Sequence, residues 1–240
     1  MGLKVRIVVS LCALVALGSF ATTATADPGP VGLCTETGAS SDPGVALSGT
    51  YRSLTISGNA YVDFGQTLRV TGGLTLAPGA CLEAFLASSV SISGGVRVAP
   101  GAVFGLGYGP GTYTVDGGVR ADHPGSVYLG GATVNGGFTS VGGGDPLRNF
   151  PIKDSTFNGD VSVTGWSGGW LGFLRNTVHG NLTISGSSAE DPDSTEVTDN
   201  QVFGNLACFG NTPMAQIGDS GGGPNTVTGH ALGECASLAG

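Results

Sequence analysis

Positive charge is scarce in this chain. Only nine of its 240 residues are Lys or Arg, whereas 17 are Asp or Glu, so the formal net charge is −8. Without residues 1–26 the cationic side chains are Lys153 and six arginines, and the charge becomes −10. Because an acidic surface repels phosphate groups, we expect no binding to nucleic acid or to anionic membranes.

A long apolar run is also missing. The longest, Ile7–Leu17, has 11 residues, whereas a membrane-spanning helix needs about 20. Lys4 and Arg6 precede it, and Ala24–Ala26 follows it as a small-x-small cleavage site. We therefore expect residues 1–26 to be a signal peptide and the mature protein to be secreted without an anchor.

Cysteine is sparse, and its spacing argues against a metal site. Four cysteines follow the signal peptide, at Cys34, Cys81, Cys208 and Cys235. No two have a C-x-x-C spacing, and an even number in an exported chain favours two disulfides. Three pairings are possible, and proximity along the chain favours Cys34–Cys81 with Cys208–Cys235.

Glycine, in contrast, is abundant, with 43 of the 214 residues after the signal peptide. No G-x-y period indicates collagen, and β-branched residues are too frequent for a disordered chain. Instead, glycines recur at intervals of 19 to 25 residues. The repeating column consists of Gly49, Gly72, Gly94, Gly117, Gly136, Gly159, Gly180, Gly204 and Gly229.

Each glycine of this column lies at the centre of a strand-like pattern. Apolar residues stand two positions before and two after it, as Leu47 and Tyr51 do around Gly49, while the odd offsets are mostly polar. Stacked copies bury an apolar face that one short strand cannot bury alone. The sequence therefore predicts an all-β fold, a parallel β-helix or β-solenoid of about eight coils of ~22 residues over 47–240, with 27–46 as an N-terminal cap.

Two further features follow from this register. Asn176, Asn200 and Asn225 each precede a column glycine by four residues, which predicts a structural amide ladder. Cys208 and Cys235 fall on adjacent coils and can form a disulfide. Cys34 and Cys81 would lie about 10 Å apart, beyond the limit of about 7 Å, unless the segment before the first coil folds as a cap over the end.

The coil pattern resembles the single-stranded parallel β-helix superfamily, which includes pectate lyases, polysaccharide-degrading enzymes, adhesins and passenger domains. The segments NTVHGNLTISG, NQVFGNLACFGNTP and GGGPNTVTGHALGEC further resemble the C-terminal coils of uncharacterised secreted actinobacterial proteins. The resemblance implies the fold and no particular activity.

Two loops carry residues typical of catalysis. GDSGGGP at 218–224 resembles the nucleophile motif of chymotrypsin-like proteases, but the extra glycine and the absence of a histidine in the matching context favour a spacer. The second loop is acidic, and three interpretations stay open: a solvated loop, a calcium site at Asp191 and Asp193, or a carboxylate pair for glycoside hydrolysis. Its acids are Glu190, Asp191, Asp193, Glu196 and Asp199.

Outward positions predict a flat polar strip on the solenoid. Three positions before the column glycine stand Thr114, Thr133, Thr156 and Thr177, and one position before it stand Asp116, Asn135, Asn158 and His179. The strip is a soluble surface, a glycan-binding surface, or an ice-binding surface, although ice-binding solenoids prefer paired threonine columns.

Arginine and tryptophan supply the remaining candidate binding residues. Arg97 and Arg120, with Arg52, occupy one column, so acidic neighbours or an anionic ligand should offset the stacked like charges. Trp166 and Trp170 flank a glycine-rich loop and either stack on sugars or pack onto the core.

Together these patterns favour a secreted, non-enzymatic β-solenoid that binds a polysaccharide or cell-wall surface, or that is structural. A carbohydrate-active lyase or hydrolase and an ice-binding protein are the alternatives. We expect a monomer with no cofactor.

Overall fold

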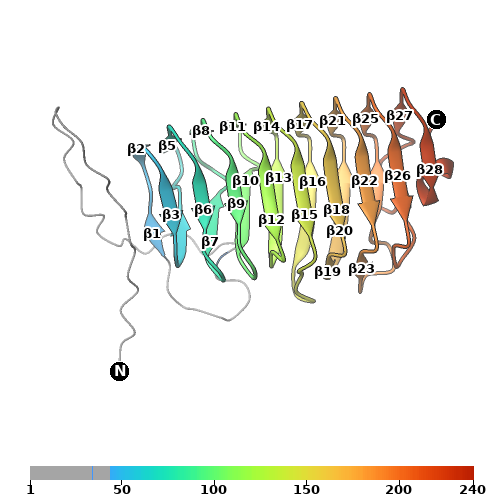
Figure 1. The fold of residues 1–240 in the computed structure, drawn as a ribbon, viewed down its shortest axis with the longest axis horizontal. Coiled ribbons are helices and arrows are strands. Elements are labelled where there is room, and N and C mark those ends of the chain that lie inside the picture. The colour runs from blue at the N-terminus through green and yellow to red at the C-terminus, as the bar shows by residue number, and fades with distance from the viewer. Residues whose placement is uncertain (1–33, 35–43) are drawn as a thin grey trace.

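The computed structural model describes Cys34 and residues 44–240, which form a rod of stacked coils (Figure 1). Each full coil gives one strand to each of three sheets, called A, B and C here, and the strands of each sheet pair in parallel with those of the adjacent coils. The predicted parallel β-solenoid of about eight coils is therefore confirmed. Within the described residues, no helix has the length and apolar character needed to cross a membrane.

The strands are short and follow the coils in chain order. Sheet A contains β1 (Val45–Ala46), β4 (Asn59–Tyr61), β7 (Cys81–Ala84), β10 (Val103–Gly107), β13 (Ser126–Gly130), β16 (Asn149–Lys153), β20 (Trp170–Leu174) and β24 (Glu196–Thr198). Sheet B contains β2 (Gly49–Tyr51), β5 (Thr67–Val70), β8 (Ser89–Ile92), β11 (Thr112–Val115), β14 (Ala132–Val134), β17 (Thr156–Phe157), β21 (Thr177–Val178), β25 (Gln201–Val202) and β27 (Thr226–Val227). Sheet C contains β3 (Leu54–Ile56), β6 (Leu74–Leu76), β9 (Val96–Val98), β12 (Val119–Asp122), β15 (Phe138–Val141), β18 (Val161–Thr164), β22 (Leu182–Ser185), β26 (Leu206–Phe209) and β28 (Ala231–Gly233). A small fourth sheet pairs β19 (Ser167–Gly168) with β23 (Ser188–Ala189), and the 3-10 helix η1 (Glu234–Ser237) follows β28.

The core is the apolar column that the period-2 pattern predicts. Inward residues of the three sheets are buried along the rod. In the middle coils this column is aromatic: the ring centroid of Phe138 lies 6.2 Å from that of Phe150 and 5.9 Å from that of Phe157. Stacked coils thus bury side chains that no single coil could bury alone.

The register confirms the glycine column from Gly72 onward but not its first member. Gly49 pairs with Leu68, and Tyr51 pairs with Val70. The reason is a shorter corner in the first coil, where only Arg52 and Ser53 connect β2 to β3, whereas 71–73 connect the next pair of strands. Leu47 and Tyr51 were therefore assigned to the wrong core positions.

The same shift removes Arg52 from the arginine column. Arg97 pairs with Thr75, and Thr75 pairs with Thr55. Thr55 is thus the first-coil residue of that column, and the prediction for Arg52 is wrong.

The asparagine column forms the predicted amide ladder at a buried corner. Asn176 donates through Nδ2 to Oδ1 of Asn200 at 3.1 Å, and Asn200 donates in the same way to Asn225 at 2.9 Å. All three side chains are buried. Because each amide also bonds to backbone groups, the ladder satisfies polar groups inside the corner and is structural.

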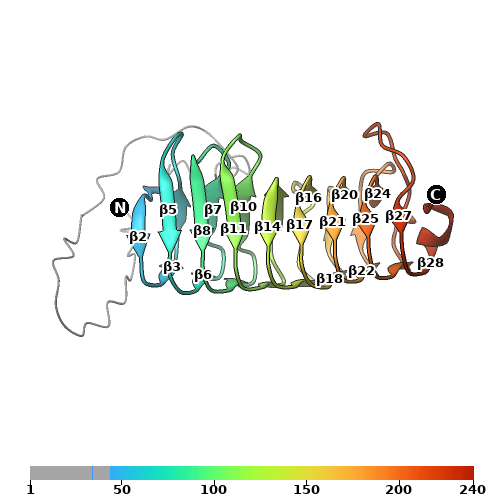
Figure 2. The same cartoon turned by 90° about the horizontal axis from the view of Figure 1, so that it is seen from above.

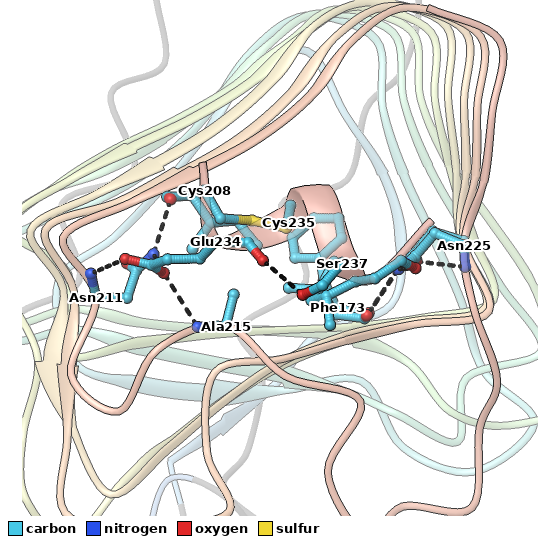
Figure 3. The surroundings of a disulfide bond; sticks show 12 residues. Phe173, Cys208, Asn211, Ala215, Asn225, Glu234, Cys235 and Ser237 are labelled. Atoms are coloured by element: carbon cyan, nitrogen blue, oxygen red, sulfur yellow. Dashed lines mark hydrogen bonds between the residues drawn. A yellow bond between two sulfur atoms is a disulfide. The ribbon is translucent and has the colours of Figure 1, made fainter. Parts of the chain in front are cut away.

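Both predicted disulfides are present. Cys208 and Cys235 join adjacent coils with Cα atoms 5.2 Å apart, beside the C-terminal 3-10 helix (Figure 3). Cys34 bonds to Cys81 with Cα atoms 5.6 Å apart, and together with Val103 these residues form a small apolar cluster. The predicted signal peptide and most of the predicted N-terminal cap fall in 1–33 and 35–43, which lie outside the described residues. Strand pairing already begins at Val45, two residues before the expected start of the solenoid.

Candidate functional site

A cleft of about 950 Å³ lies over the outer face of sheet A. Aromatic side chains line it at Phe85, Tyr108, Tyr128 and Trp170, and Lys153, Glu190 and Asp191 add charge. In Figure 2 the loop before β11 (green) and the loop before β27 (red) extend beyond the coils that lie between them. Most of the lining residues lie on or next to β10, β13, β16 and β20, so the cleft crosses several coils of the rod.

Tyr108 lies flat on the sheet because glycine stands beneath it. A Cβ atom at Gly130 would lie 2.7 Å from ring atoms of Tyr108, so no other residue leaves room for the ring. The hydroxyl donates to the carbonyl of Pro151 at 3.0 Å, and burial raises the pKa of Tyr108 well above its ordinary value. Phe85 contacts the ring edge-on, with centroids 5.3 Å apart. Tyr108 is thus held as a rigid aromatic surface.

Trp170 forms a second aromatic surface by the same device. A Cβ atom at Gly172 would lie 1.9 Å from Cη2 of the indole, so the ring lies over this glycine. The indole N–H donates to Oε1 of Glu196 at 3.1 Å, and Nζ of Lys153 lies 5.0 Å from the ring centroid. Glu196 is 1% exposed, and its Oε2 has no hydrogen-bond partner in the part of the chain that the structure describes.

The GDSGGGP loop packs against this site as a spacer. Gly218 lies against the side chain of Glu196, where a Cβ atom would come within 2.3 Å of Cγ. Thr198 donates through Oγ1 to the carbonyl of Gly223 at 2.8 Å, and the N–H of Gly223 donates to Asp199 at 2.9 Å. Ser220 lines the cleft, and no described contact brings a histidine to it.

The acidic residues divide between the cleft and the structure around it. Glu190 and Asp191 line the cleft, whereas Glu196 is buried beneath Trp170. Asp191 accepts the N–H of Asp193 at 3.0 Å, which fixes a local turn. Among the described residues, no group of three or more His, Cys, Asp or Glu is arranged to hold a metal ion. The calcium site at Asp191 and Asp193 stays a prediction without a built ligand set.

The polar strip exists on sheet B, and part of it is bonded to itself. Its threonines pair in register across four strands at Thr114, Thr133, Thr156 and Thr177. In the neighbouring column, Asn135 donates to Asp116 at 3.0 Å and Asn158 donates to Asn135 at 2.8 Å. No described segment crosses this face in Figure 2. The strip is open, but hydrogen bonds between its own side chains already occupy amide groups that a ligand would need.

His179, the last member of that column, has a different partner. Its ring stacks on Phe203 with centroids 4.8 Å apart and planes 9° apart. Phe203 is 42% exposed, so this end of the strip is partly apolar. The strip therefore does not continue as a uniform row of hydrogen-bonding groups.

The two tryptophans differ in exposure: Trp166 lies in the core and Trp170 at the surface of the cleft. Trp166 is fully buried, with its ring centroid 5.4 Å from that of Phe150. A buried ring cannot stack on a ligand, so the prediction that Trp166 is a binding residue is wrong. Trp170 lines the cleft, and its role in binding stays a prediction.

Sequence reasoning missed the other aromatic residues of the cleft. Phe85, Tyr108 and Tyr128 belong to sheet A or to the corners after it, and the glycine column does not align that part of the coil. The available signal was glycine next to an outward aromatic, as in Gly107-Tyr108 and Trp170-Leu171-Gly172.

Arg97 and Arg120 form a separate basic pair on sheet C. They pair in register on β9 and β12, and both are exposed. They border a shallow groove of about 400 Å³. Among the described residues, neither has an acidic partner, so the local charge pairing considered from the sequence is not found there.

Comparisons with protein-family models, with curated proteins and with solved structures find no match for this chain.

Proposed function

We propose that the chain is a secreted β-solenoid that binds polysaccharide through the aromatic cleft on sheet A. The observation that carries the proposal is the pair of rings, Tyr108 and Trp170, that lie over glycines along one cleft. The proposal is one of binding, with Lys153, Glu190 and Asp191 as the polar groups that contact the ligand.

The chemistry of the cleft suits a sugar chain. Aromatic rings offer broad apolar surface to the C–H faces of sugars, while a few charged groups bond to hydroxyls. Tyr108 is restrained by its hydrogen bond to Pro151 and Trp170 by its bond to Glu196. Rings that are already ordered lose little conformational entropy when a ligand binds.

Two further features support an extracellular carbohydrate ligand. Two disulfides are typical of exported chains, and residues 1–26 have the pattern of a signal peptide. The coil pattern resembles the parallel β-helix superfamily, many of whose members act on polysaccharides, and the C-terminal coils resemble secreted actinobacterial proteins. We infer membership of that superfamily from the repeat alone.

The test is co-sedimentation of the mature protein with chitin, cellulose, pectin and bacterial cell wall. We expect retention on at least one of them, a loss of about tenfold in affinity for Trp170→Ala, equivalent to about 1.4 kcal/mol, and partial recovery for Trp170→Phe. Phe64→Ala is the matched control, because Phe64 is an aromatic residue that is 72% exposed and lies outside the cleft.

Two outcomes would overturn the proposal. One is no retention of the wild-type protein on any of these polymers; the other is Trp170→Ala binding as tightly as Phe64→Ala. The same incubations are read for reducing sugars and unsaturated products, with and without EDTA. Product release that depends on cleft residues would identify a hydrolase or lyase in place of a binding protein.

A further inference from the structure

The corner between sheets B and C changes its chemistry halfway along the rod. In the late coils, the residue after the column glycine is Asp160, Asn181, Asn205 or His230, whereas in the early coils it is Gly73, Gly95, Gly118 or Gly137. The glycine positions line the shallow groove beside Arg97 and Arg120. The two halves therefore offer different groups at equivalent places on one surface.

In the late coils, a side-chain oxygen of the preceding coil accepts the backbone N–H of Asn181, Asn205 and His230. The N–H of Asn181 donates to Oδ1 of Asp160 at 2.8 Å, and that of Asn205 donates to Oδ1 of Asn181 at 2.9 Å. The N–H of His230 donates to Oδ1 of Asn205 at 2.8 Å. Each coil thus supplies an oxygen to the N–H of the coil after it.

In the early coils, the same N–H groups lack that oxygen because glycine has no side chain. The N–H groups of Gly95, Gly118 and Gly137 have no acceptor among the described residues. They follow one another from coil to coil, about 4.8 Å apart. Rows of backbone N–H groups bind anions, and the late coils show that an oxygen fits at this corner.

The arginines stand beside this row of N–H groups. Arg97 and Arg120 are each two residues beyond a corner glycine and border the same groove, and Thr75 and Thr139 flank them in the same column. Guanidinium groups bind carboxylate and sulfate through paired hydrogen bonds. Two cations with no acidic partner in the described part of an acidic chain are most simply balanced by a ligand.

We propose that Arg97, Arg120 and the N–H groups of Gly95, Gly118 and Gly137 bind the acidic groups of a polysaccharide that lies along the rod. The ligand is a glycan with carboxylate or sulfate on successive sugars, so that neighbouring coils contact neighbouring acidic groups. The site lies on sheet C and does not rest on the aromatic cleft of sheet A. Nucleic acid is disfavoured as the ligand because the rest of the surface is acidic.

Isothermal titration with polygalacturonate, and with its methyl-esterified form as the neutral control, tests the proposal. We expect binding only to the acidic polymer, weakened by added salt and reduced at least tenfold in the double variant Arg97→Gln/Arg120→Gln. Arg69→Gln is the matched control, since Arg69 is an exposed arginine on β5 of sheet B.

A second variant tests the row of N–H groups without changing charge. Gly73→Asn should place an amide oxygen on the N–H of Gly95, as Asn181 does for Asn205, and its Cβ would be 3.4 Å from the nearest atom, an ordinary contact. We expect unchanged or higher thermal stability and binding weakened severalfold. Wild-type affinity in the double arginine variant, equal binding of the esterified polymer, or equal binding of duplex DNA would overturn the proposal.

Discussion

Trp170 and Glu196 are joined across adjacent strands of sheet A by a 3.1 Å hydrogen bond from the indole N–H to Oε1. Glu196 is buried, and Trp170 is the half-buried ring that lines the cleft. The carboxylate therefore fixes the position of the ring from below. Under the proposed function, Glu196 acts on the glycan only by positioning Trp170.

We expect Glu196→Ala to loosen Trp170 and weaken glycan binding, whereas Glu196→Gln keeps an acceptor and preserves both. Acrylamide quenching of fluorescence checks this, because Trp166 is fully buried and the accessible emission comes from Trp170. Quenching and affinity that are the same in all three proteins would show that Glu196 only fills space.

The buried amide ladder should be far more important for stability than the exposed one. Asn200→Ala removes the acceptor for the N–H of Asn176 and a donor to the carbonyl of Phe173. We expect it to lower the free energy of unfolding by about 2–4 kcal/mol, since buried polar groups lose their partners. Urea denaturation measures the change. Asn158→Ala, in the exposed ladder, is the control and should cost under about 1 kcal/mol.

Glu234 should make the C-terminal end sensitive to acid. Burial alone would raise the pKa of Glu234, but hydrogen bonds from the N–H of Ala215 and from Asn211 together hold it below its ordinary value (Figure 3). A carboxyl with a lowered pKa stabilises the fold above its ordinary value of 4.5, and that contribution is lost as the pH falls through the lowered pKa.

The melting temperature of Glu234→Gln measures this contribution. We expect the variant to melt below the wild type at pH 7 and the difference to shrink as the pH falls below about 4.5, toward pH 3. A difference that is constant over this range would show that the charge of Glu234 does not contribute.

The two tryptophans should separate stability from binding. Trp166→Ala leaves a cavity beside Phe150 and should cost about 3–5 kcal/mol of unfolding free energy. Trp170→Ala should change stability much less while reducing glycan affinity. Thermal denaturation and co-sedimentation of both variants check this, and equal destabilisation by the two would contradict it.

The sequence predicted well what repeats with the glycine column, and poorly what does not. Val115, Val119 and their equivalents were assigned correctly because sheets B and C flank the column at fixed offsets. The prediction failed for the first coil because the corner between β2 and β3 is one residue shorter than the corner between β5 and β6. The corners that connect sheet A to the other two sheets vary in length from coil to coil. The outward aromatic residues of sheet A therefore do not align at a fixed distance from the column glycine.

Trp166 illustrates why local composition misled. It stands in a glycine-rich stretch that is typical of an open loop, yet its ring is buried against Gly168, where a Cβ atom would come within 2.3 Å. Because Ser167 pairs with Ser188, the residue of the next coil that corresponds to Trp166 is the small Ser187. Glycine here makes room for a core side chain, and only the stacking of coils distinguishes that from an exposed loop.

The tail after β28 covers part of the C-terminal end of the rod. After β28, η1 turns across the last coil with Cys235 bonded to Cys208, and the N–H of Asn225 donates to the carbonyl of Leu238 at 2.8 Å. Bare strand edges recruit further strands, which is how solenoid and sheet proteins polymerise into fibres. Here the backbone N–H and carbonyl of Asn225 on the last coil both bond to the chain's own tail, at Leu238 and Gly240, so at this corner the strand edge is already paired.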